Sequence, residues 1–308
     1  MAGHDHSGGF RTAAGSHRGH LGVVLGIYGA IIVAELIGAR ISGSLALLAE
    51  AGHMAVDASG ILVALIATFL AARKASSKRT YGMMRAEIVA VLVNCLLLFG
   101  LAAFILLEAI ERWVNPPAVA GGPVIAFAVV GLVGASASLM LLRRGAKESL
   151  NVKAAFLEVL SDGIGSAAII LSGVLNLAFG WDRGDALAAA AIGLIILPRA
   201  FALLKQAVNV IMQGVPEGID ADLVRAQIEA TAGVSEVHSL HVWGLTSGVN
   251  VMTAHVVLDE EARAYDRQME VLDALTDLMR QDHGIEHCTF QMEAPGHIEH
   301  EGTLNREL

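Results

Sequence analysis

The sequence predicts an α-helical membrane protein in which six transmembrane helices are followed by a cytoplasmic α/β domain. Three observations predict this fold class. The 308-residue chain is 55% hydrophobic and 17% charged, with a mean hydropathy of +0.59, which is far too apolar for an ordinary soluble protein. Six long apolar stretches lie before residue 212. After that residue the apolar pattern changes completely, so the chain divides into a membrane part and a soluble part.

Each apolar stretch is long enough to cross a bilayer, because about 20 helical residues span a hydrocarbon core of about 30 Å. The stretches run over residues 21–39, 45–72, 87–107, 123–142, 154–178 and 186–204. The preceding segment, "MAGHDHSGGFRTAAGSHRGH", lacks the basic start, apolar run and cleavage site of a secretory signal. We therefore expect the first stretch to be a retained transmembrane helix.

Basic residues in the short loops predict the orientation of these helices, because Lys and Arg favour the cytoplasmic side. The loops after the second and fourth stretches carry Lys or Arg at positions 73, 74, 78, 79, 85, 143, 144, 147 and 153. The three alternate loops offer only Arg40, Arg112 and Arg183. Both termini are therefore expected in the cytoplasm.

The part after residue 212 has the pattern of a small α/β domain. Helical apolar spacing marks "DADLVRAQIEATAG" (220–233) and "YDRQMEVLDALTDLMRQDHG" (265–284). Strand-like segments, rich in β-branched residues or alternating in polarity, are "VSEVHSLHVWGL", "GVNVMTAHVVL" and "IEHCTFQME". The resulting order αββαβ fits a split βαβ, ferredoxin-like sheet with its helices on one face.

Charge and cysteine content exclude several function classes. Residues 1–212 carry 16 Lys and Arg against 12 Asp and Glu, whereas residues 213–308 carry 5 against 18. The acidic soluble part repels nucleic acid and attracts cations. Only Cys95 and Cys288 are present, which excludes a disulfide framework and a thiolate metal site and suits a reducing compartment.

Two pairs of ionisable residues lie inside apolar stretches. His53 and Asp57 are four residues apart in the second stretch, and Glu158 and Asp162 are four apart in the fifth. Each pair falls on one helix face, one turn apart. An ionisable group at the bilayer centre costs about 2.5–3.5 kcal/mol, so such groups usually face a cavity, a partner or an ion. Two helices that supply two ligands each can complete the four N/O ligands of tetrahedral Zn²⁺.

A structural role is the alternative for any single polar residue in a membrane helix, because a buried polar group needs a hydrogen-bond partner. This alternative is weaker for two pairs at helical spacing on two helices. It is stronger for residues that lie mostly toward the ends of the stretches, which we expect to cap helices or form interhelical hydrogen bonds. These residues are Glu35, Glu50, Glu87, Asn94 and Glu108.

Five groups of residues follow one another in an order and spacing typical of one known family. They are "SGSLALLAEAGHMAVDA", "TYGMMRAEIVAVLVNCLLL", "EAIERWVNPP", "LNVKAAFLEVLSDGIGS", and "VHSLHVW" with "AHVVL". Over roughly residues 20 to 293 the chain resembles the cation diffusion facilitator family of divalent-metal transporters. The resemblance implies a homodimeric metal/proton antiporter of a bacterial inner membrane, similar to zinc, cobalt and cadmium exporters. It places the transport site at His53, Asp57, Glu158 and Asp162.

One residue departs from the pattern that the resemblance implies, because the commonest zinc-transporting members have His at the position of Glu158. One imidazole with three carboxylates is a harder ligand set, which shifts preference toward Mn²⁺ and Fe²⁺, whereas His53 favours Zn²⁺. We expect export of Zn²⁺, with Cd²⁺, Co²⁺ or Fe²⁺ as further substrates, and a carrier that prefers Mn²⁺ or Fe²⁺ is the alternative. Proton exchange is expected because imidazole and carboxylate must lose protons to bind metal.

Eleven of the twelve histidines lie outside the apolar stretches. In related proteins the soluble domain binds additional metal at positions that resemble His238, His255 and Glu293, sometimes with His241. Metal binding and a structural role both stay open for these residues. Loose metal capture and a dispensable tail both stay open for the Gly- and Ser-rich N-terminal cluster of His4, His6, His17 and His20.

Strand parity predicts which of these side chains share a face, because successive residues of a strand point to opposite faces. It places His241 on the face of Trp243 and opposite to His238. It also places Gln291, a poor metal ligand, on the face of Glu293, and it places Cys288, Phe290 and Met292 on the core face.

The domain prediction has four parts: a disordered His-rich segment at 1–20, a six-helix transport domain at 21–212, a metal-binding-like dimerisation domain at 213–295 and a flexible tail at 296–308. No cofactor or ATP is expected, because the chain has no G-x-x-x-x-G-K-[ST] motif. The predicted partners are divalent metal ions, protons, the membrane and a second copy of the chain, with no nucleic acid.

Two rival functions belong to other classes. An intramembrane metallohydrolase needs about three protein ligands, an open water position and a general base. Four ligands are available here and no H-E-x-x-H motif is present, which disfavours an enzyme. A non-transporting membrane metal sensor is the second rival.

Overall fold

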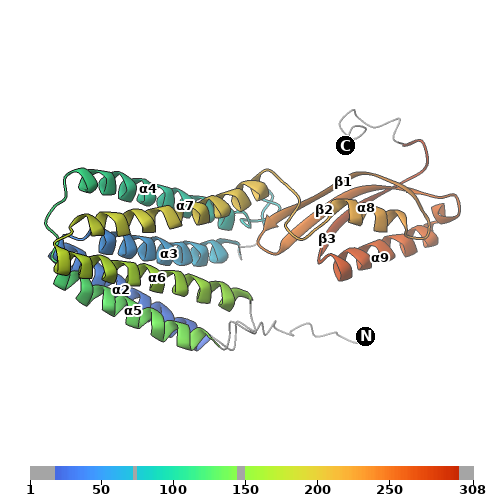
Figure 1. Ribbon diagram of the computed structural model, residues 1–308. Coiled ribbons are helices and arrows are strands. Elements are labelled where there is room, and N and C mark those ends of the chain that lie inside the picture. Colours follow the sequence, from blue (N-terminus) through green and yellow to red (C-terminus); the bar gives the residue numbers. More distant parts are fainter. Residues whose placement is uncertain (1–17, 72–74, 144–149, 298–308) are drawn as a thin grey trace. The chain divides into compact units, whose positions relative to one another are not determined.

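The computed structural model of the protein describes residues 18–71, 75–143 and 150–297 (Figure 1). Most of the predicted His-rich segment and most of the predicted tail lie outside these residues. The described residues form two compact units. The first contains the described residues up to Leu62 and Asn94–Phe201, and the second contains those of 63–93 and those from Ala202 onward.

Six long helices coincide with the six predicted apolar stretches, and several extend beyond the predicted ends. Their bounds are Arg18–Ser42 (α2), Leu45–Ala71 (α3), Ala86–Val114 (α4), Gly121–Leu142 (α5), Leu150–Phe179 (α6) and Arg183–Ile211 (α7). Within the described residues, four helices are long and apolar enough to cross a membrane: α4, α5, α7 and, from Ala155 onward, α6. They expose large apolar side chains, such as Leu107 and Met140, which suits lipid rather than water. The protein is therefore a helical, multi-pass membrane protein.

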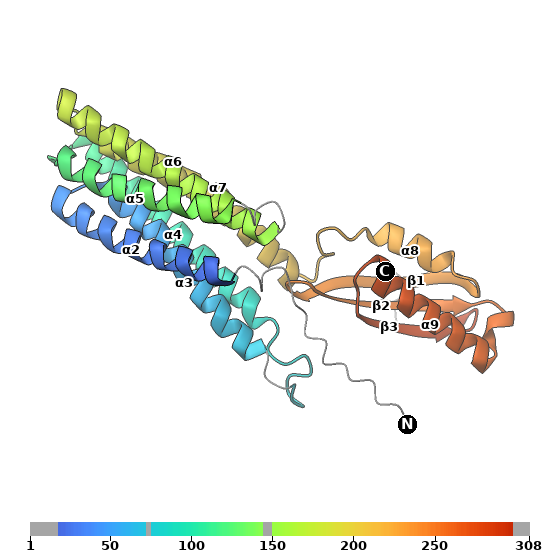
Figure 2. The same ribbon diagram turned by 90° about the horizontal axis from the view of Figure 1, so that it is seen from below.

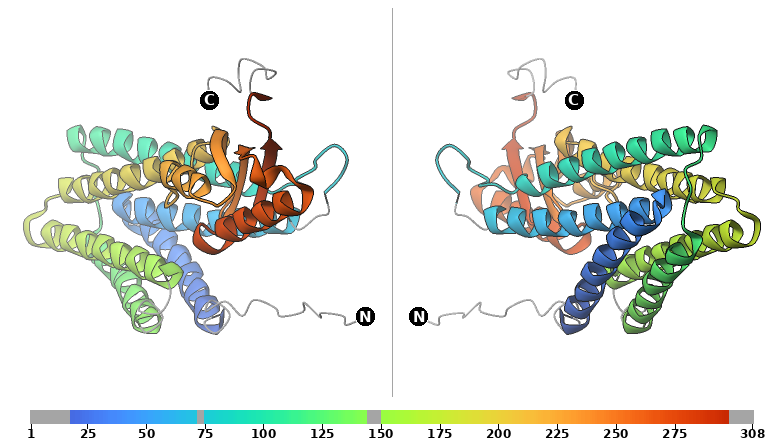
Figure 3. Two further views of the ribbon diagram at one scale, coloured as in Figure 1. Left: turned by 90° about the vertical axis from the view of Figure 1, so that its right-hand side faces the viewer. Right: turned by 90° about the vertical axis from the view of Figure 1, so that its left-hand side faces the viewer.

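In the first unit the helices form two layers. α2, α5 and α6 lie in one layer, and α3, α4 and α7 lie in the other (Figures 1 and 3). Small residues let helices of the first layer approach closely: a Cβ atom added to Gly38 of α2 would lie only 2.5 Å from the ring of Phe127 on α5. A buried apolar core joins the two layers and includes Leu45, Leu98, Ile105, Val124, Ile169 and Ile196.

One buried carboxylate fixes the start of α3 against α7. Asp185, in the first turn of α7, accepts hydrogen bonds from the backbone N–H groups of Leu45 (2.6 Å) and Ala46 (3.4 Å), and from the hydroxyl of Ser44. The first N–H groups of a helix have no partner inside the helix, so Asp185 supplies an interhelical cap. The cap lies two turns before His53 in α3 and so helps to fix the position of that residue.

The second unit contains a three-stranded sheet with two helices. Its elements are α8 (Ala221–Glu229), β1 (Val234–Thr246), β2 (Val249–Leu258), the short 3₁₀ helix η2 (Glu261–Arg263), α9 (Tyr265–Asp282) and β3 (His287–Glu293). The strand order is β1-β2-β3, with β1 and β2 antiparallel and β2 and β3 parallel. Both helices cover the same face of the sheet (Figure 2). The predicted element order is confirmed for this C-terminal domain.

Local chemistry sets the ends of these elements. Asp220 caps α8 by accepting from the N–H groups of Asp222 (3.0 Å) and Leu223 (3.2 Å). α8 ends earlier than predicted, and Gly233, with φ of +95°, then turns the chain into β1. The buried core holds α8, α9 and the sheet together and includes Val224, Ile228, Met252, Val256, Leu275 and Met279. Cys288, Phe290 and Met292 pack against it, as strand parity predicts.

Candidate functional site

The predicted pair on α3 lies inside the first unit. His53 is 8% exposed, and the side chain of Asp57 is 13% exposed. One turn of helix separates them, and the Nδ1 atom of His53 lies 3.4 Å from the Oδ2 atom of Asp57. The pair therefore shares one helix face, as its spacing predicts.

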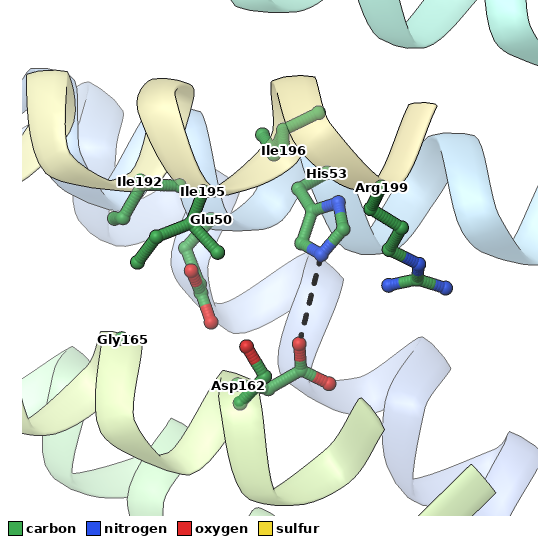
Figure 4. A pocket seen from close by; sticks show the side chains of 9 residues that line it. Glu50, His53, Asp162, Gly165, Ile192, Ile195, Ile196 and Arg199 are labelled. Carbon is green, nitrogen blue, oxygen red and sulfur yellow. Dashed lines mark ion pairs between the residues drawn. The ribbon is translucent and has the colours of Figure 1, made fainter. Parts of the chain in front are cut away.

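The predicted pair on α6 faces the pair on α3. Asp162 is 6% exposed, and its Oδ1 atom lies 3.7 Å from the Nε2 atom of His53 (Figure 4). Its Oδ2 atom accepts a hydrogen bond from the hydroxyl of Tyr28 on α2. His53 thus lies between aspartates from two different helices, with one ring nitrogen toward each.

Arg199 of α7, which was not among the predicted site residues, also belongs to this cluster. Its Nη2 atom lies 2.5 Å from the Oε1 atom of Glu158, and its Nη1 atom lies 3.5 Å from the Oδ2 atom of Asp57. The available signal was an arginine in the sixth apolar stretch, where a charge needs a partner. α7 thus adds a cation to the four predicted ligands.

A small cavity of about 40 Å³ opens at this cluster. The ring of His53 and the carboxylates of Glu50 and Asp162 point into it from α3 and α6, and α7 closes the opposite side (Figure 4). The complete lining is Glu50, His53, Ser161, Asp162, Gly165, Ile192, Ile195, Ile196 and Arg199. The cavity therefore has ionisable side chains of α3, α6 and α7 on an otherwise apolar wall.

Two further acidic residues are buried beside this space. Glu35 of α2 is 0% exposed, and neither of its carboxylate oxygens has a hydrogen-bond partner among the described residues. Glu50 is 2% exposed, and its Oε1 atom likewise lacks a partner among them. The expectation of interhelical hydrogen bonds is wrong for these oxygens among the described residues. A Cβ atom at Gly131 or Gly165 would fall within 3 Å of Glu35 or Glu50, so glycine at these positions leaves room for the two carboxylates.

The 3.4 Å separation of His53 and Asp57 is typical of two ligands of one zinc ion, and the 3.7 Å separation of His53 and Asp162 is slightly longer. Two ligand atoms, each 2.0–2.2 Å from one tetrahedral Zn²⁺, lie about 3.3–3.6 Å apart. However, the two aspartates approach different nitrogens of one ring, and an imidazole offers only one nitrogen to a given metal. A ring or carboxylate movement is therefore needed before His53, Asp57 and Asp162 can share one ion.

A second histidine cluster lies in the C-terminal domain. The Oε2 atom of Glu293 lies 3.2 Å from the Nε2 atom of His238, and its Oε1 atom lies 2.8 Å from the Nδ1 atom of His255. The two rings meet edge to face, 5.0 Å apart between centroids. Within the part of the chain that the structure describes, this is the one group of three or more His, Cys, Asp or Glu residues whose ligand atoms all lie within 4.8 Å. The sheet thus preassembles a donor set that suits a divalent metal.

Strand pairing corrects the prediction for His241. His238 pairs with His255 and His241 pairs with Thr253, so three steps on β1 match two on β2. This bulge, with Ser239 at φ of +47°, places His238 and His241 on the same face rather than opposite faces. His241 is nevertheless exposed and outside the close group, which leaves it out of the donor set.

Gln291 lies beside the cluster, on the face that parity predicts. It pairs with His255 across β2 and β3, and its Nε2 atom donates a 2.7 Å hydrogen bond to the Oε1 atom of Glu293. An amide in this place orients the carboxylate, whereas a carboxylate or imidazole there would add a stronger metal ligand.

Comparison with known proteins follows the same division of the chain. Residues 21–212 match the cation efflux transmembrane domain, and residues 216–295 match the cation efflux protein cytoplasmic domain. The metal cation efflux system protein CzcD of Cupriavidus metallidurans is 41% identical over 290 residues, which are 94% of this chain and 89% of CzcD.

Two other relatives are named for the ions they move. A cadmium, cobalt and zinc/H(+)-K(+) antiporter of Bacillus subtilis is 36% identical over 273 residues, 86% of each chain. The zinc transporter ZitB of Escherichia coli is 36% identical over 270 residues, 87% of this chain and 85% of ZitB. These proteins are metal transporters and not enzymes, which removes the metallohydrolase rival. The resemblance seen in the motifs is confirmed, and this chain belongs to the cation efflux family of transporters.

Proposed function

We propose that this protein exports Zn²⁺ from the cytoplasm in exchange for protons, and that the metal binds between α3 and α6. One observation carries the proposal: His53 lies between Asp57 and Asp162, which come from two helices, beside a small cavity that buried ionisable side chains line within an apolar bundle. The relatives named for zinc, cadmium and cobalt support the same class of substrate. Cd²⁺, Co²⁺ and Fe²⁺ are further substrates in this proposal, because each accepts imidazole and carboxylate ligands.

Proton exchange follows from the chemistry of the ligands. An imidazole and carboxylates bind metal only when deprotonated, so metal release lets them take up protons. The antiporter name of the Bacillus subtilis relative supports this coupling. Rocking of the helix bundle would expose the site to each side of the membrane in turn.

The proposed architecture extends the predicted topology. All six helices α2 to α7 cross the inner membrane and both termini lie in the cytoplasm. The four predicted parts at 1–20, 21–212, 213–295 and 296–308 are kept, except that α2 takes in residues 18–20 of the first part. The C-terminal domain is ferredoxin-like and joins two copies into a homodimer, which the αββαβ order and the match to the cytoplasmic domain support. His238, His255 and Glu293 bind a structural or regulatory metal ion there.

Flux into liposomes tests the transport proposal. Purified protein should accumulate Zn²⁺ when a proton gradient is imposed, and Mn²⁺, Fe²⁺, Co²⁺ and Cd²⁺ measured in parallel give the selectivity. Asp57→Ala should abolish flux, whereas Glu108→Ala, a carboxylate of α4 paired with Arg112 outside the cavity, should leave it unchanged. Normal flux in Asp57→Ala would show that the proposed site is wrong, and flux insensitive to the proton gradient would remove the antiport. Preferred uptake of Mn²⁺ or Fe²⁺ would establish the alternative substrate class.

A further inference from the structure

Arg199 lies where the transported cation is proposed to bind. Its guanidinium spans Glu158 of α6 and Asp57 of α3, which are two of the four predicted ligands. The contact with Glu158 is the closer one, at 2.5 Å against 3.5 Å. A guanidinium is charged at any physiological pH and presents several N–H donors in one plane, so it can hold two carboxylates at once.

The charge balance of the cluster changes when Arg199 is included. The three carboxylates of Asp57, Glu158 and Asp162 carry three negative charges when ionised, and His53 is neutral as a metal ligand. Among the predicted ligands, Arg199 cancels one of these charges and leaves two, the number that balances a divalent cation. The combination of Glu158 and Arg199 is therefore equivalent in charge to one neutral ligand such as imidazole.

Partial burial strengthens the interactions of Arg199 with Glu158 and Asp57. The side chains of Arg199 and Glu158 are 39% and 29% exposed, and that of Asp57 is 13% exposed. Charges at such positions interact more strongly than in bulk water, because the surrounding medium has a lower effective dielectric constant. A metal ion and a guanidinium therefore compete for the same carboxylate oxygens.

We propose that Arg199 is a tethered counter-ion of the transport site: it holds Glu158 away from the metal, leaves His53, Asp57 and Asp162 as the metal ligands, and weakens metal binding by competing at Asp57. This inference rests on the proposed function, because it assumes that metal binds in the cavity between α3 and α6. It also changes the role of Glu158, which becomes the partner of Arg199 rather than a fourth ligand. Selectivity then stays on the zinc side, because Glu158 adds no free oxygen donor.

Zinc titration of the purified full-length protein tests the proposal. Arg199→Gln frees Glu158 and Asp57 and removes a positive charge, so the dissociation constant for Zn²⁺ should fall by roughly tenfold or more. Glu158→Gln leaves Arg199 to compete at Asp57 alone, so binding should weaken. The double variant Arg199→Gln with Glu158→Gln removes both charges and should bind within about threefold of the wild type. Lys205→Gln removes a basic charge from the same helix outside the cavity and should change nothing.

The opposite pattern would overturn the proposal. If Arg199 instead positions Glu158 as a metal ligand, Arg199→Gln weakens binding and the double variant binds no better than either single variant. The double variant has no unpaired charge at these two positions, so it distinguishes the two roles of Arg199 even if Arg199→Gln does not fold. Asp57→Ala distinguishes a wrong transport site from a wrong role for Arg199. Zinc that Asp57→Ala still binds belongs to other sites, and this amount is subtracted from the zinc bound by each other variant. Wild-type binding in Asp57→Ala refutes the site itself, whereas lost binding there without tightening in Arg199→Gln refutes only the role of Arg199.

Discussion

His53 has a different carboxylate at each of its two ring nitrogens, and this arrangement limits how the ring can bind a metal ion. Only one nitrogen can bind a given metal, so the other remains available to a carboxylate that orients the ring. The 3.4 Å separation from Asp57 and the 3.7 Å separation from Asp162 leave either choice open to a small rotation. A carrier benefits from such a site, because its ligands must release the ion as well as bind it.

Tyr28 is the residue that fixes one of these carboxylates. Its hydroxyl donates to Asp162 from α2, so Tyr28→Phe should leave Asp162 in place but poorly oriented. Loss of a partner that orients a metal ligand typically costs about 10–100-fold in affinity, and we expect the zinc concentration for half-maximal flux to rise by at least about tenfold. Tyr81→Phe, at an exposed tyrosine, is the matched control. An unchanged concentration dependence in Tyr28→Phe would mean that Asp162 does not need this donor.

Which site residues the sequence predicts depends on whether they share one element. Asp57 follows His53 by one helical turn, and the same spacing joins Glu158 to Asp162, so the pattern alone puts each pair on one face. Arg199 has no such partner on α7, and its contacts with α3 and α6 arise only from tertiary packing. Residue spacing within one helix therefore cannot indicate the role of Arg199.

Elements are predicted well where a regular period continues and poorly where one residue interrupts it. The helices and strands of both units follow apolar periodicity closely. β1 contains a bulge at Ser239, a non-glycine residue with positive φ. No typical turn residue at this position predicts the bulge from the sequence. Parity fails for His241 for this reason, although it holds along the regular strand β3.

The start of α3 provides a prediction about helix packing. Asp185→Ala removes the acceptor for the N–H groups of Leu45 and Ala46 and for Ser44, all of which are buried. Loss of such a cap costs about 2 kcal/mol, so the protein in detergent should unfold at a lower temperature. Asp185→Asn keeps one acceptor oxygen and should lose less. Equal unfolding temperatures for the wild type and Asp185→Ala would show that this cap does not stabilise the bundle.

β3 provides a prediction about pH, because burial raises the pKa of the Cys288 thiol from 9.0 to about 11. The folded state then holds the proton more tightly than the unfolded state. This contribution to stability is complete below pH 9 and is lost as the pH rises through 11. In a Cys95→Ser background, alkylation of Cys288 in the folded protein should accelerate only as the pH approaches 11, whereas the urea-unfolded chain should react near pH 9. Identical pH profiles for the two states would contradict the burial argument.

At the scale of the whole molecule, the two histidine clusters differ in how their side chains are held. Three hydrogen-bonded strands hold ligand atoms of His238, His255 and Glu293 within 4.8 Å of one another. The site between α3 and α6 takes its residues from separate helices, includes a competing arginine and has its aspartates on different ring nitrogens. A preassembled site suits an ion that stays bound, whereas a site that needs rearrangement suits an ion that passes through.

The preassembled site should therefore stabilise the protein when zinc is present, independently of transport. In an Asp57→Ala background, which removes the proposed transport site, zinc should still raise the temperature at which the full chain unfolds. Binding to the folded state alone contributes about 2.7 kcal/mol at a free zinc concentration 100 times the dissociation constant. His238→Ala combined with His255→Ala removes two of the three ligands and should abolish this shift. His241→Ala, at the exposed histidine outside the group, should retain it. A zinc-dependent shift of equal size in all three variants would place the stabilising ion elsewhere, because only the cluster on the sheet loses its ligands in the double variant.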